Sequence, residues 1–439
     1  MPKQYMHMDI KQLYKLYTEH PVITTDSRDC PPGSIFLALK GESFDGNQFA
    51  AAALEKGCAY AIVDNPAASP ADDRLIVVDD CLQTFKDLAR EHRRQFDIPV
   101  IGITGTNGKT TTKELIATTL SQQYNVLYTQ GNFNNDVGVP KTLLRLTKEH
   151  EIAVIEMGAS HPGDIKTLVE TVEPTGGLIT NVGRAHLQGF GSFEGVKRTK
   201  GELYDFLGKA GGLVFVNADS ADLCQMAAER HLANTLSYGQ ADGASVRGEV
   251  VECNPYLKFK WTADGSVWHV TQTHLIGAYN IANLLAAVTV GSYFGVAPGQ
   301  IGAALAQYTP SNNRSQLTVT SRNQLVVDAY NANPSSMMAA LENFRLLPMA
   351  HKMVIIGDMR ELGDASAEEH QRVTDFLGTM QLDEAWLVGE EFAKTRCNYR
   401  KFHDVEDVKA ALAGQCPEQR TILIKGSNSM RLYQLPELL

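Results

Sequence analysis

The stretch GITGTNGKTTTKE, residues 102–114, has the residue types of a loop that binds the phosphates of a nucleotide. Its glycines would let backbone N–H groups curl around phosphate at the start of a helix. Lys109 would neutralise the outer phosphates, and the hydroxyl of Thr110 would reach a magnesium ion. The residues expected to contact the nucleotide are Gly105, Thr106, Asn107, Gly108, Lys109, Thr110 and Thr111.

This loop departs from the usual phosphate-binding pattern at its first position. The standard loop has four residues between its first glycine and the Gly-Lys pair, which here places Ile103 at the first-glycine position. The chain also has no Asn-Lys-x-Asp motif of the kind that reads guanine, which disfavours a GTPase. A glycine-rich turn with an exposed lysine is the alternative, but GKTT between a buried strand and a helix favours nucleotide binding.

Two further side chains follow apolar runs of the kind that make buried strands. Glu156 ends the run IAVIE, and His186 lies in NVGRAH, directly after GGLIT. Open parallel sheets bind ligands at the carboxyl ends of their strands, so both side chains are expected at one mouth of the sheet. A single histidine is more often structural. Together with Thr110, however, these residues predict a metal or catalytic site.

The elements that position these residues form a central block, residues 98–309. Strand-like runs (PVIGIT, IAVIEM, GGLIT, GLVFVN) alternate with helical patterns, which is typical of βαβ units. Between about 235 and 275 alternating strands and turns predict a small antiparallel insertion. We therefore expect a central mononucleotide-binding domain with a mostly parallel sheet.

The central block is flanked by two others, so the predicted fold class is α/β with three domains. Residues 1–97 combine short strands, turns and the helical pattern NQFAAAALEKG, which predicts a small N-terminal α/β domain. Residues 310–439 repeat the βα alternation in QLVVDAYNANP, KMVIIGDMRELG, EAWLVGE and TILIKGS. This pattern predicts a C-terminal Rossmann-like domain, although it has no GxGxxG turn.

Composition and charge limit the class of protein, its expected location and its expected ligands. The 439 residues are 44% hydrophobic and 21% charged, which is ordinary for a globular protein, and no apolar run reaches membrane-spanning length. The first twenty residues lack the apolar core of a secretory signal, so a cytoplasmic location is expected. The seven scattered cysteines are expected to be reduced thiols. A net charge of -10 without Lys/Arg clusters disfavours nucleic-acid binding.

Several motifs together carry a family resemblance. GxxGKTT, EMGASHPGDI, NVGRAHLQGFGS, TKGELY, YNIANLLAA, NNRSQ and DAYNANPSSM occur in the order found in the Mur ligases, ATP-dependent amide ligases of peptidoglycan assembly. The match covers nearly the whole chain and explains the shortened loop. DAYNANPSSM and GDMRELG resemble the member that adds D-alanyl-D-alanine to UDP-N-acetylmuramoyl-tripeptide. The preceding ligase typically has Asp-Asn-Pro-Arg where this chain has residues 331–334.

The resemblance implies a reaction and its cofactors. ATP, with magnesium, would phosphorylate the terminal carboxylate of the UDP-linked tripeptide, giving an acyl phosphate. The amine of D-alanyl-D-alanine would then displace phosphate and form the UDP-muramoyl-pentapeptide. Whether the third residue of the tripeptide is lysine or diaminopimelate does not follow from the chain, and a monomer is expected.

The resemblance also implies a set of metal ligands. Thr110 and Glu156 are similar to residues that hold magnesium, and His186 to one that holds a second ion. Lys200, in TKGELY, stands where the family carries a carbamylated lysine. A carbamate would give magnesium an oxygen ligand. From the residues alone, a solvated lysine is the default interpretation.

Other positions resemble ATP and substrate contacts. Asn280 and Asn283 would share a helix face near the adenine, beside Tyr279, where the family usually has histidine. Arg314 and Asp328 resemble residues that reach ATP phosphate and ribose, with a surface ion pair as the alternative. In Lys425-Gly426-Ser427-Asn428 the last residue replaces the usual arginine, which weakens a role there. The substrate contacts implied are Ser27, Arg28, Lys40, Gly41, Asn134, Asn135, Asn331 and Asn333.

Two alternatives to this activity stay open at this point. Another ligase of the same superfamily, such as a folylpolyglutamate synthase, also joins an amine to an activated carboxylate, but lacks the domain that residues 1–97 resemble. A non-catalytic ATP-binding regulator would bind or hydrolyse ATP without an amine-dependent product.

Overall fold

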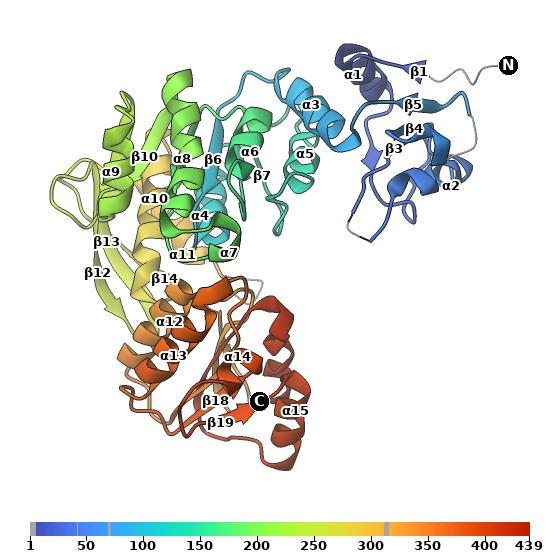
Figure 1. The fold of residues 1–439 in the computed structure, drawn as a ribbon. Coiled ribbons are helices and arrows are strands. Elements are labelled where there is room, and N and C mark those ends of the chain that lie inside the picture. The colour runs from blue at the N-terminus through green and yellow to red at the C-terminus, as the bar shows by residue number, and fades with distance from the viewer. Residues whose placement is uncertain (1–5, 42, 69–71, 311–315) are drawn as a thin grey trace.

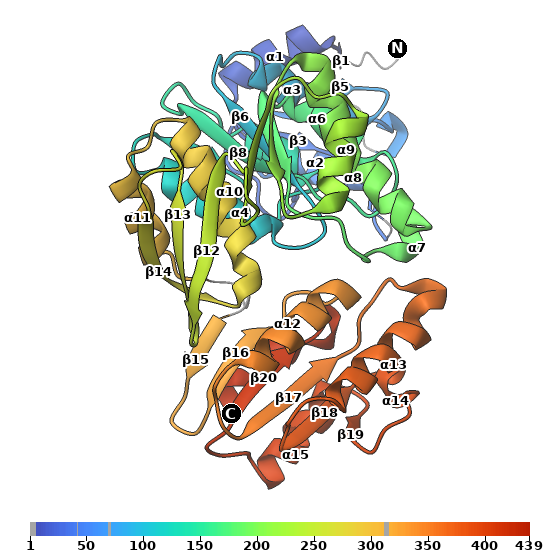
Figure 2. The ribbon, with the colours of Figure 1, turned by 90° about the vertical axis from the view of Figure 1, so that its left-hand side faces the viewer.

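The computed structural model describes residues 6–41, 43–68, 72–310 and 316–439, which form three sheets in chain order (Figures 1 and 2). Figure 1 shows the N-terminal sheet, in blue, beside the central sheet, and the C-terminal sheet, in orange and red, below it. Helices alternate with strands in all three parts, which confirms the α/β fold class with three sheets. The boundaries at 97/98 and 309/310 stay predictions.

The N-terminal sheet has the strand order β1-β5-β4-β3-β2, and its strand pairs are parallel. Its strands are β1 (Met6–His7), β2 (Ile23–Thr24), β3 (Ile35–Leu37), β4 (Tyr60–Val63) and β5 (Leu75–Val77). Its helices are α1 (Ile10–Glu19), α2 (Ala50–Glu55) and α3 (Cys81–Arg93), with 3-10 turns η1 (Gly46–Phe49) and η2 (Pro66–Ala68). Helix α3 leads into the central sheet.

The central sheet has the order β14-β13-β12-β11-β10-β9-β6-β8-β7. Its strands are β6 (Val100–Thr104), β7 (Val126–Tyr128), β8 (Ile152–Glu156), β9 (Gly176–Ile179), β10 (Leu213–Asn217), β11 (Thr235–Gly239), β12 (Val246–Cys253), β13 (Tyr256–Thr262) and β14 (His269–Ile276). Its helices are α4 (Lys109–Leu120), α5 (Gly138–Leu143), α6 (Asp164–Val172), α7 (Leu187–Phe190), α8 (Phe193–Ala210), α9 (Ala221–Glu229), η3 (Ala278–Asn280), α10 (Ile281–Tyr293) and α11 (Pro298–Gln307).

Helices cover both faces of the central sheet. Every residue of β6 and β8 is buried, as their continuous apolar runs predict for strands between two helical layers. Helices α4, α10 and α11 pack on one face, and α5, α6, α8 and α9 on the other. Helix α10 is apolar on nearly all sides because it lies between the sheet and its neighbouring helices. The ligand-binding strand ends are therefore held by a rigid scaffold.

The predicted antiparallel insertion over residues 235–275 is confirmed from β12 to β14 but not at β11. β11 pairs parallel with β10 and also with β12, so the parallel part of the sheet continues for two strands beyond β10. Helix α9 makes the crossover that brings β11 in parallel to β10. The antiparallel pairs are β12–β13 and β13–β14, and the turn between β13 and β14 includes Gly265, at a φ of 74°. The hairpin is an edge of the main sheet.

The C-terminal sheet has the order β15-β16-β20-β17-β18-β19, parallel except for the β15–β16 pair. Its strands are β15 (Gln316–Val319), β16 (Gln324–Asp328), β17 (Lys352–Gly357), β18 (Glu384–Val388), β19 (Arg400–Phe402) and β20 (Thr421–Lys425). Its helices are α12 (Pro334–Leu346), η4 (Gly363–Ala365), α13 (Ser366–Leu377), α14 (Glu390–Ala393), α15 (Val405–Gly414), η5 (Asn428–Met430), η6 (Leu432–Gln434) and η7 (Pro436–Leu438). Helices on both faces agree with the predicted Rossmann-like arrangement.

The structure bears on two predictions from composition, those on the cysteines and on membrane-spanning segments. All seven cysteines lie within the described ranges and are unpaired thiols there, as expected. Within the same ranges, no helix is both long enough and apolar enough to cross a bilayer.

Candidate active site

The phosphate-binding loop connects β6 to α4 through backbone conformations that require glycine. Gly105 has a φ of 144° and Gly108 a φ of 77°. A Cβ atom on Gly105 would lie 2.0 Å from Thr180 Oγ1, and one on Gly108 would lie 2.8 Å from Asn283 Oδ1. Any side chain at either position would therefore displace the loop. Because α4 begins at Lys109, the free N–H groups of its first turn lie where a phosphate would bind.

The end of β9 braces this loop. Thr180 Oγ1 donates a 2.6 Å hydrogen bond to the carbonyl of Asn107, and Asn181 Nδ2 donates to the same carbonyl at 2.9 Å. The N–H of Asn107 donates to Asn181 Oδ1 at 3.0 Å, and the N–H of Thr106 to the Asn181 carbonyl. The loop is thus held before any ligand binds, and Thr180 and Asn181 are functional residues that the sequence analysis missed.

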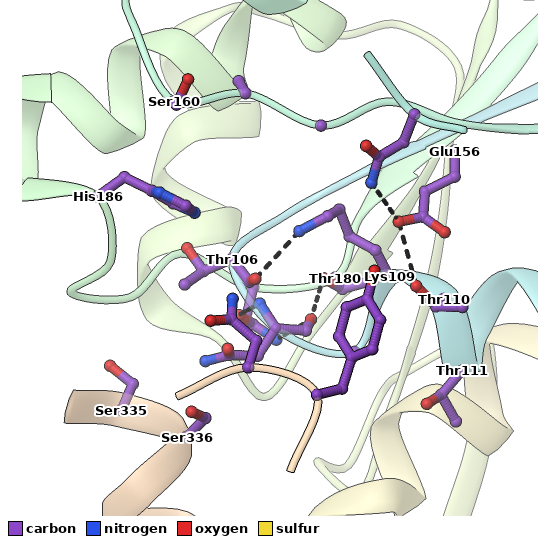
Figure 3. Close-up of a pocket in the computed structure, with 18 of the residues that line it drawn as sticks. Thr106, Lys109, Thr110, Thr111, Glu156, Ser160, Thr180, His186, Ser335 and Ser336 are labelled. Carbon is purple, nitrogen blue, oxygen red and sulfur yellow. Dashed lines mark hydrogen bonds between the residues drawn. The ribbon is translucent and has the colours of Figure 1, made fainter. Parts of the chain in front are cut away.

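Lys109 lies over the loop with its ammonium inside the pocket (Figure 3). Its Nζ donates to the carbonyls of Gly105 at 2.8 Å and Thr106 at 3.1 Å. These two hydrogen bonds hold the cation beside the loop. A phosphate group on the loop would meet a positive charge that is already in place.

Glu156 is buried at the end of β8, with 1% of its surface exposed. Its Oε1 accepts hydrogen bonds from Thr110 Oγ1 at 3.2 Å and from Asn134 Nδ2 at 2.8 Å, as Figure 3 shows. Its Oε2 has no hydrogen-bond partner among the described residues. Leaving a buried carboxylate oxygen unpaired is costly, and a hard divalent cation would satisfy it. Glu156 and Thr110 therefore fit a magnesium ion.

His186 projects from the turn before α7 into the same pocket (Figure 3). Its Nδ1 contacts the carboxylate of Glu361 from the C-terminal domain. Burial lowers the pKa of the imidazole below its ordinary value, although Glu361 acts in the opposite direction. This direction favours the neutral imidazole, which is the form that binds metals.

Lys200 is buried inside α8 with 2% of its surface exposed, so the default interpretation as a solvated lysine is wrong. Its Nζ lies 3.5 Å from the carbonyl of Ala159 and 5.4 Å from the centre of the Phe190 ring. Burial, and then the positive charge of Lys109, hold the pKa of this amine well below its usual value. An unprotonated amine is the reactive form for carbamylation, which stays a prediction.

Asn280 and Asn283 lie on one helix face, as their spacing predicts, and both line the pocket. Asn280 Nδ2 donates to the carbonyl of Ile276, and Asn283 Nδ2 donates to Asn280 Oδ1, each at 2.8 Å. Asn283 Oδ1 accepts from Thr112 Oγ1. The pair thus fixes the start of α10 against α4, and its contact with adenine stays a prediction.

The C-terminal domain contributes Asp328 at the end of β16. Lys425, at the end of β20, donates from Nζ to Asp328 Oδ2 at 2.6 Å and to the Asn331 carbonyl at 3.2 Å. Lys425 is buried, so its contact with Asp328 is not a surface ion pair. Arg314, predicted to reach the ATP phosphate, lies outside the described residues.

These side chains surround one pocket of about 870 Å³ between the central and C-terminal domains. The loop before α4 and the first turn of α12 both line this pocket, and they meet where Asn333 Nδ2 donates to Asn107 Oδ1 at 2.8 Å. Predicted residues that line it are Thr106, Asn107, Gly108, Lys109, Thr110, Thr111, Asn134, Asn135, Glu156, His186, Asn280, Asn283, Asp328 and Asn331. A pocket of this size, rich in polar groups and shared by two domains, suits a nucleotide together with a second substrate.

Comparison with known proteins agrees with this geometry. Residues 103–291 match the model for the Mur ligase middle domain, residues 313–428 that for the Mur ligase glutamate ligase domain, and residues 21–93 that for the Mur ligase family catalytic domain. The UDP-N-acetylmuramoyl-tripeptide--D-alanyl-D-alanine ligase of Escherichia coli is 35% identical over 94% of this chain and 92% of its own. The chain belongs to the Mur ligase family.

The similarity in sequence is accompanied by similarity to solved structures. A crystal structure of MurF from Acinetobacter baumannii superposes on this Mur ligase with a TM-score of 0.86, at 32% identity over 94% of this chain and 92% of its own. A crystal structure of MurF from Thermotoga maritima in complex with ADP gives 0.85, at 28% identity over 95% and 96%. The three-domain arrangement of this Mur ligase is therefore that of its family.

Some predicted residues of this Mur ligase do not line the pocket: Gly105, Lys200, Asn333, Ser27, Arg28, Lys40 and Gly41. Gly105 acts on the loop conformation, and Lys200 lies beneath Ala159, which does line the pocket. Asn333 caps α12. The other four lie in the N-terminal domain, where Arg28 pairs with Asp26 and Lys40 with Asp64.

Other residues of this Mur ligase line the pocket and were missed in the sequence analysis: Ser160, His161, Asp164, Thr180, Asn181, Tyr330, Ser335, Ser336 and Lys425. Most of them follow the carboxyl ends of β8, β9 and β16, or, like Lys425, end a strand. The rule that identified Glu156 and His186 would have selected them if every polar residue after a strand had been considered. Asn135, which was predicted, also accepts from the N–H of Gly138 and so caps α5.

Proposed function

We propose that this protein is the ligase that adds D-alanyl-D-alanine to UDP-N-acetylmuramoyl-tripeptide, consuming ATP and giving UDP-muramoyl-pentapeptide. The observation that carries the proposal is the unpaired, buried Oε2 of Glu156 beside the phosphate-binding loop. It supports a site where a cation and a nucleotide phosphate meet. The full-length similarity to ligases of this name supports the choice of substrates.

Magnesium is the cation that fits this donor set. Thr110 and Glu156 would hold one ion, and His186 with Lys200 as its carbamate would hold a second. Hydroxyl and carboxylate oxygens are ligands that magnesium prefers. When bound, the metal supplies positive charge that lets the γ-phosphate approach a carboxylate of the same sign.

The chain's own residues then act in defined roles. The first-turn amides of α4 and the Lys109 ammonium bind the outer phosphates and stabilise the charge that moves during phosphoryl transfer. Asn134 and Thr110 fix the orientation of the Glu156 carboxylate. Asp328, held by Lys425, faces the pocket from the C-terminal domain and would bind the ribose. Closure of that domain would exclude water from the acyl phosphate until the amine of the dipeptide attacks it.

The remaining roles are part of the same proposal. Ser27, Arg28, Lys40 and Gly41 would bind the uridine nucleotide in the N-terminal domain. Asn134, Asn135, Asn331 and Asn333 would contact the sugar, the peptide or the dipeptide near the cleft. The monomeric state and the cytoplasmic location stay predictions.

An assay of phosphate release tests the proposal directly. Release should require ATP, magnesium, UDP-N-acetylmuramoyl-tripeptide and D-alanyl-D-alanine together. Release that continues without the dipeptide would favour a regulator that only hydrolyses ATP. Equal turnover with glutamate and a folate would favour a folylpolyglutamate synthase, and either outcome would overturn the assignment.

A further inference from the structure

The loop that carries His186 lies against a turn of the C-terminal domain. His186 Nδ1 contacts the Glu361 carboxylate, and the N–H of Gln188 donates to the Glu361 carbonyl at 3.3 Å. Beside this contact, Arg184 Nη1 donates to Glu369 Oε1 at 3.3 Å. Two side-chain contacts therefore join the same two domains, but only one of them includes an imidazole that faces the pocket.

Both members of the His186–Glu361 pair have an unusual backbone conformation. His186 has a φ of 50° and Glu361 a φ of 63°, the left-handed region that residues other than glycine seldom adopt. Such conformations cost on the order of 1 kcal/mol or more each, and they persist where the surrounding structure imposes them. Two strained residues from different domains meet side chain to side chain, which points to a functional contact.

The turn that presents Glu361 is anchored by buried groups. The N–H of Met359 donates to His370 Nε2 at 3.0 Å, and the N–H of Arg360 donates to Ser427 Oγ at 3.2 Å. His370 itself is fully buried. The C-terminal domain therefore fixes the backbone that presents Glu361, while half of the Glu361 side chain is exposed.

The contact selects which ring nitrogen of His186 is presented to the pocket. A carboxylate accepts hydrogen bonds, so the nitrogen that faces Glu361 carries the hydrogen and the other nitrogen keeps its lone pair. Nε2 has no hydrogen bond to any residue of the described ranges, and the ring points toward Lys109 (Figure 3). A histidine that binds a metal commonly donates its second N–H to a carboxylate in this way.

We propose that Glu361 is a positioning residue that orients the imidazole of His186 toward the metal site only when the C-terminal domain is docked. The inference rests on the proposed function and deepens it. With Glu361 in this role, the set of metal ligands that includes His186 is complete when the domains are closed and incomplete when they separate. Premature transfer of phosphate to water would thereby be reduced, because the second ion binds firmly only after closure.

Manganese binding tests this inference without requiring turnover. Glu361→Leu removes the acceptor, Glu361→Gln keeps an acceptor oxygen without the charge, and Arg184→Gln removes the Arg184–Glu369 ion pair between the domains. Each variant, with ADP bound, is titrated with Mn²⁺ and followed by electron paramagnetic resonance. Unchanged ADP affinity and an unchanged thermal midpoint show that the variants are folded. Arg184 is a suitable control because its side chain is 58% exposed and lies outside the proposed ligand set.

The expected result separates the three variants. Glu361→Leu should weaken the binding of one Mn²⁺ by roughly tenfold, with Glu361→Gln close to the parent protein and Arg184→Gln unchanged. In the ligase assay, the magnesium concentration at half-maximal rate should follow the same order, while the KM for ATP stays constant. Unaltered Mn²⁺ binding in Glu361→Leu, or equal weakening in Arg184→Gln, would overturn the inference. The Mn²⁺ titration is valid even if the dipeptide-dependent activity is absent, so the two proposals fail independently.

Discussion

The central domain contacts its two neighbours in different ways. Its contact with the N-terminal domain, here called the α3 junction, is formed by α1 and α3 against α5 and α6. Its contact with the C-terminal domain, here called the cleft contact, is formed at the pocket by residues of the phosphate-binding loop and of the His186 loop. The two differ in burial, and this difference indicates which neighbour is free to move.

At the α3 junction, the hydrophobic cores are shared. Phe85 and Leu88 of α3 pack in the N-terminal core, while Ala89 of the same helix packs in the central core. The buried hydroxyl of Tyr17 donates to the Leu144 carbonyl at 2.9 Å across the junction. Separating these domains would expose apolar surface, so they are expected to move as one body.

At the cleft contact, the domains meet through polar side chains. Asn107 meets Asn333, Arg184 meets Glu369, and His186 meets Glu361. Apolar contact between the two domains is found at the end of β14, where Ile276 packs in the C-terminal core. Polar groups can exchange protein partners for water at little cost, whereas Ile276 cannot. The arrangement suits a hinge near Ile276 and a cleft that opens and closes. Changes to the side chains that line the pocket should therefore affect catalysis, and changes at the α3 junction should affect stability.

The largest effect is expected for Lys109→Ala. Removing the cation over the outer phosphates should lower kcat for ligation by about 10³-fold or more. The urea midpoint should change little, because hydrogen bonds from the ammonium to the Gly105 and Thr106 carbonyls contribute little net stability. Kinetics with saturating ATP and both substrates, together with urea titration, measure both quantities. Normal kinetics would remove Lys109 from the site.

Lys200→Ala should have the next largest effect. If a carbamate of Lys200 supplies a metal ligand, losing it should lower kcat by about 10²-fold or more while ATP still binds. Formate should restore part of the rate by filling the space with a small carboxylate. Lys200→Arg should not recover, because a guanidinium keeps its charge and does not accept carbon dioxide under these conditions. Full activity in Lys200→Arg would show that no carbamate is needed.

The regular parts of the fold could be predicted from the sequence because their patterns are local. β6 and β8 are buried at every residue, so their apolar runs are continuous and easily recognised. β15 and β19 were missed because they are short, lie at the edges of the sheet and are partly exposed. The direction of β11 was missed because it depends on the path of the preceding crossover.

A site residue could be predicted only where the functional side chain lies at, or directly after, the end of the strand that positions it. Lys109 and Glu156 satisfy this condition. Thr180 hydrogen-bonds the phosphate-binding loop rather than its own segment. This contact forms because β9 lies beside β6 in the sheet, although β7 and β8 separate these two strands in the chain. Glu361 reaches His186 from 175 residues away and from another domain. No local pattern predicts such a contact.

Arg93→Met tests the α3 junction, where changes are expected to affect stability rather than catalysis. Arg93 is buried at the α3 junction, and its guanidinium donates to four backbone carbonyls, those of Phe96, Val172, Ile98 and Glu173. Methionine keeps the apolar stem but leaves these acceptors unpaired, which should cost about 2–3 kcal/mol of unfolding free energy. The folded variant should retain its kcat and KM values within about twofold, because Arg93 lies outside the pocket. A large loss of kcat with unchanged stability would contradict the comparison.

The smallest effect is expected at His92, which is buried at the same junction. Its Nε2 lies 3.0 Å from the Leu146 carbonyl, to which it must donate, and its Nδ1 lies 3.0 Å from the Tyr14 hydroxyl, from which it then accepts. The rings of Tyr17 and Phe96 pack against the imidazole. Burial lowers the pKa of His92 below its ordinary value, so the folded protein keeps the ring neutral where the unfolded chain takes up a proton.

The lower pKa of His92 in the folded state determines how the unfolding free energy changes with pH. Above the unfolded pKa, about 6.5, both states hold a neutral ring and His92 contributes no pH dependence. As the pH falls below that value, the unfolded chain binds an additional proton, so the unfolding free energy declines by at most about 1.4 kcal/mol per pH unit. His92→Gln lacks the titrating group and should lose less stability than the parent protein between pH 7.5 and 5.5, the two values at which urea titrations are compared. An equal loss in both proteins would show that His92 is protonated in the folded state, and that the α3 junction is more hydrated than its burial indicates.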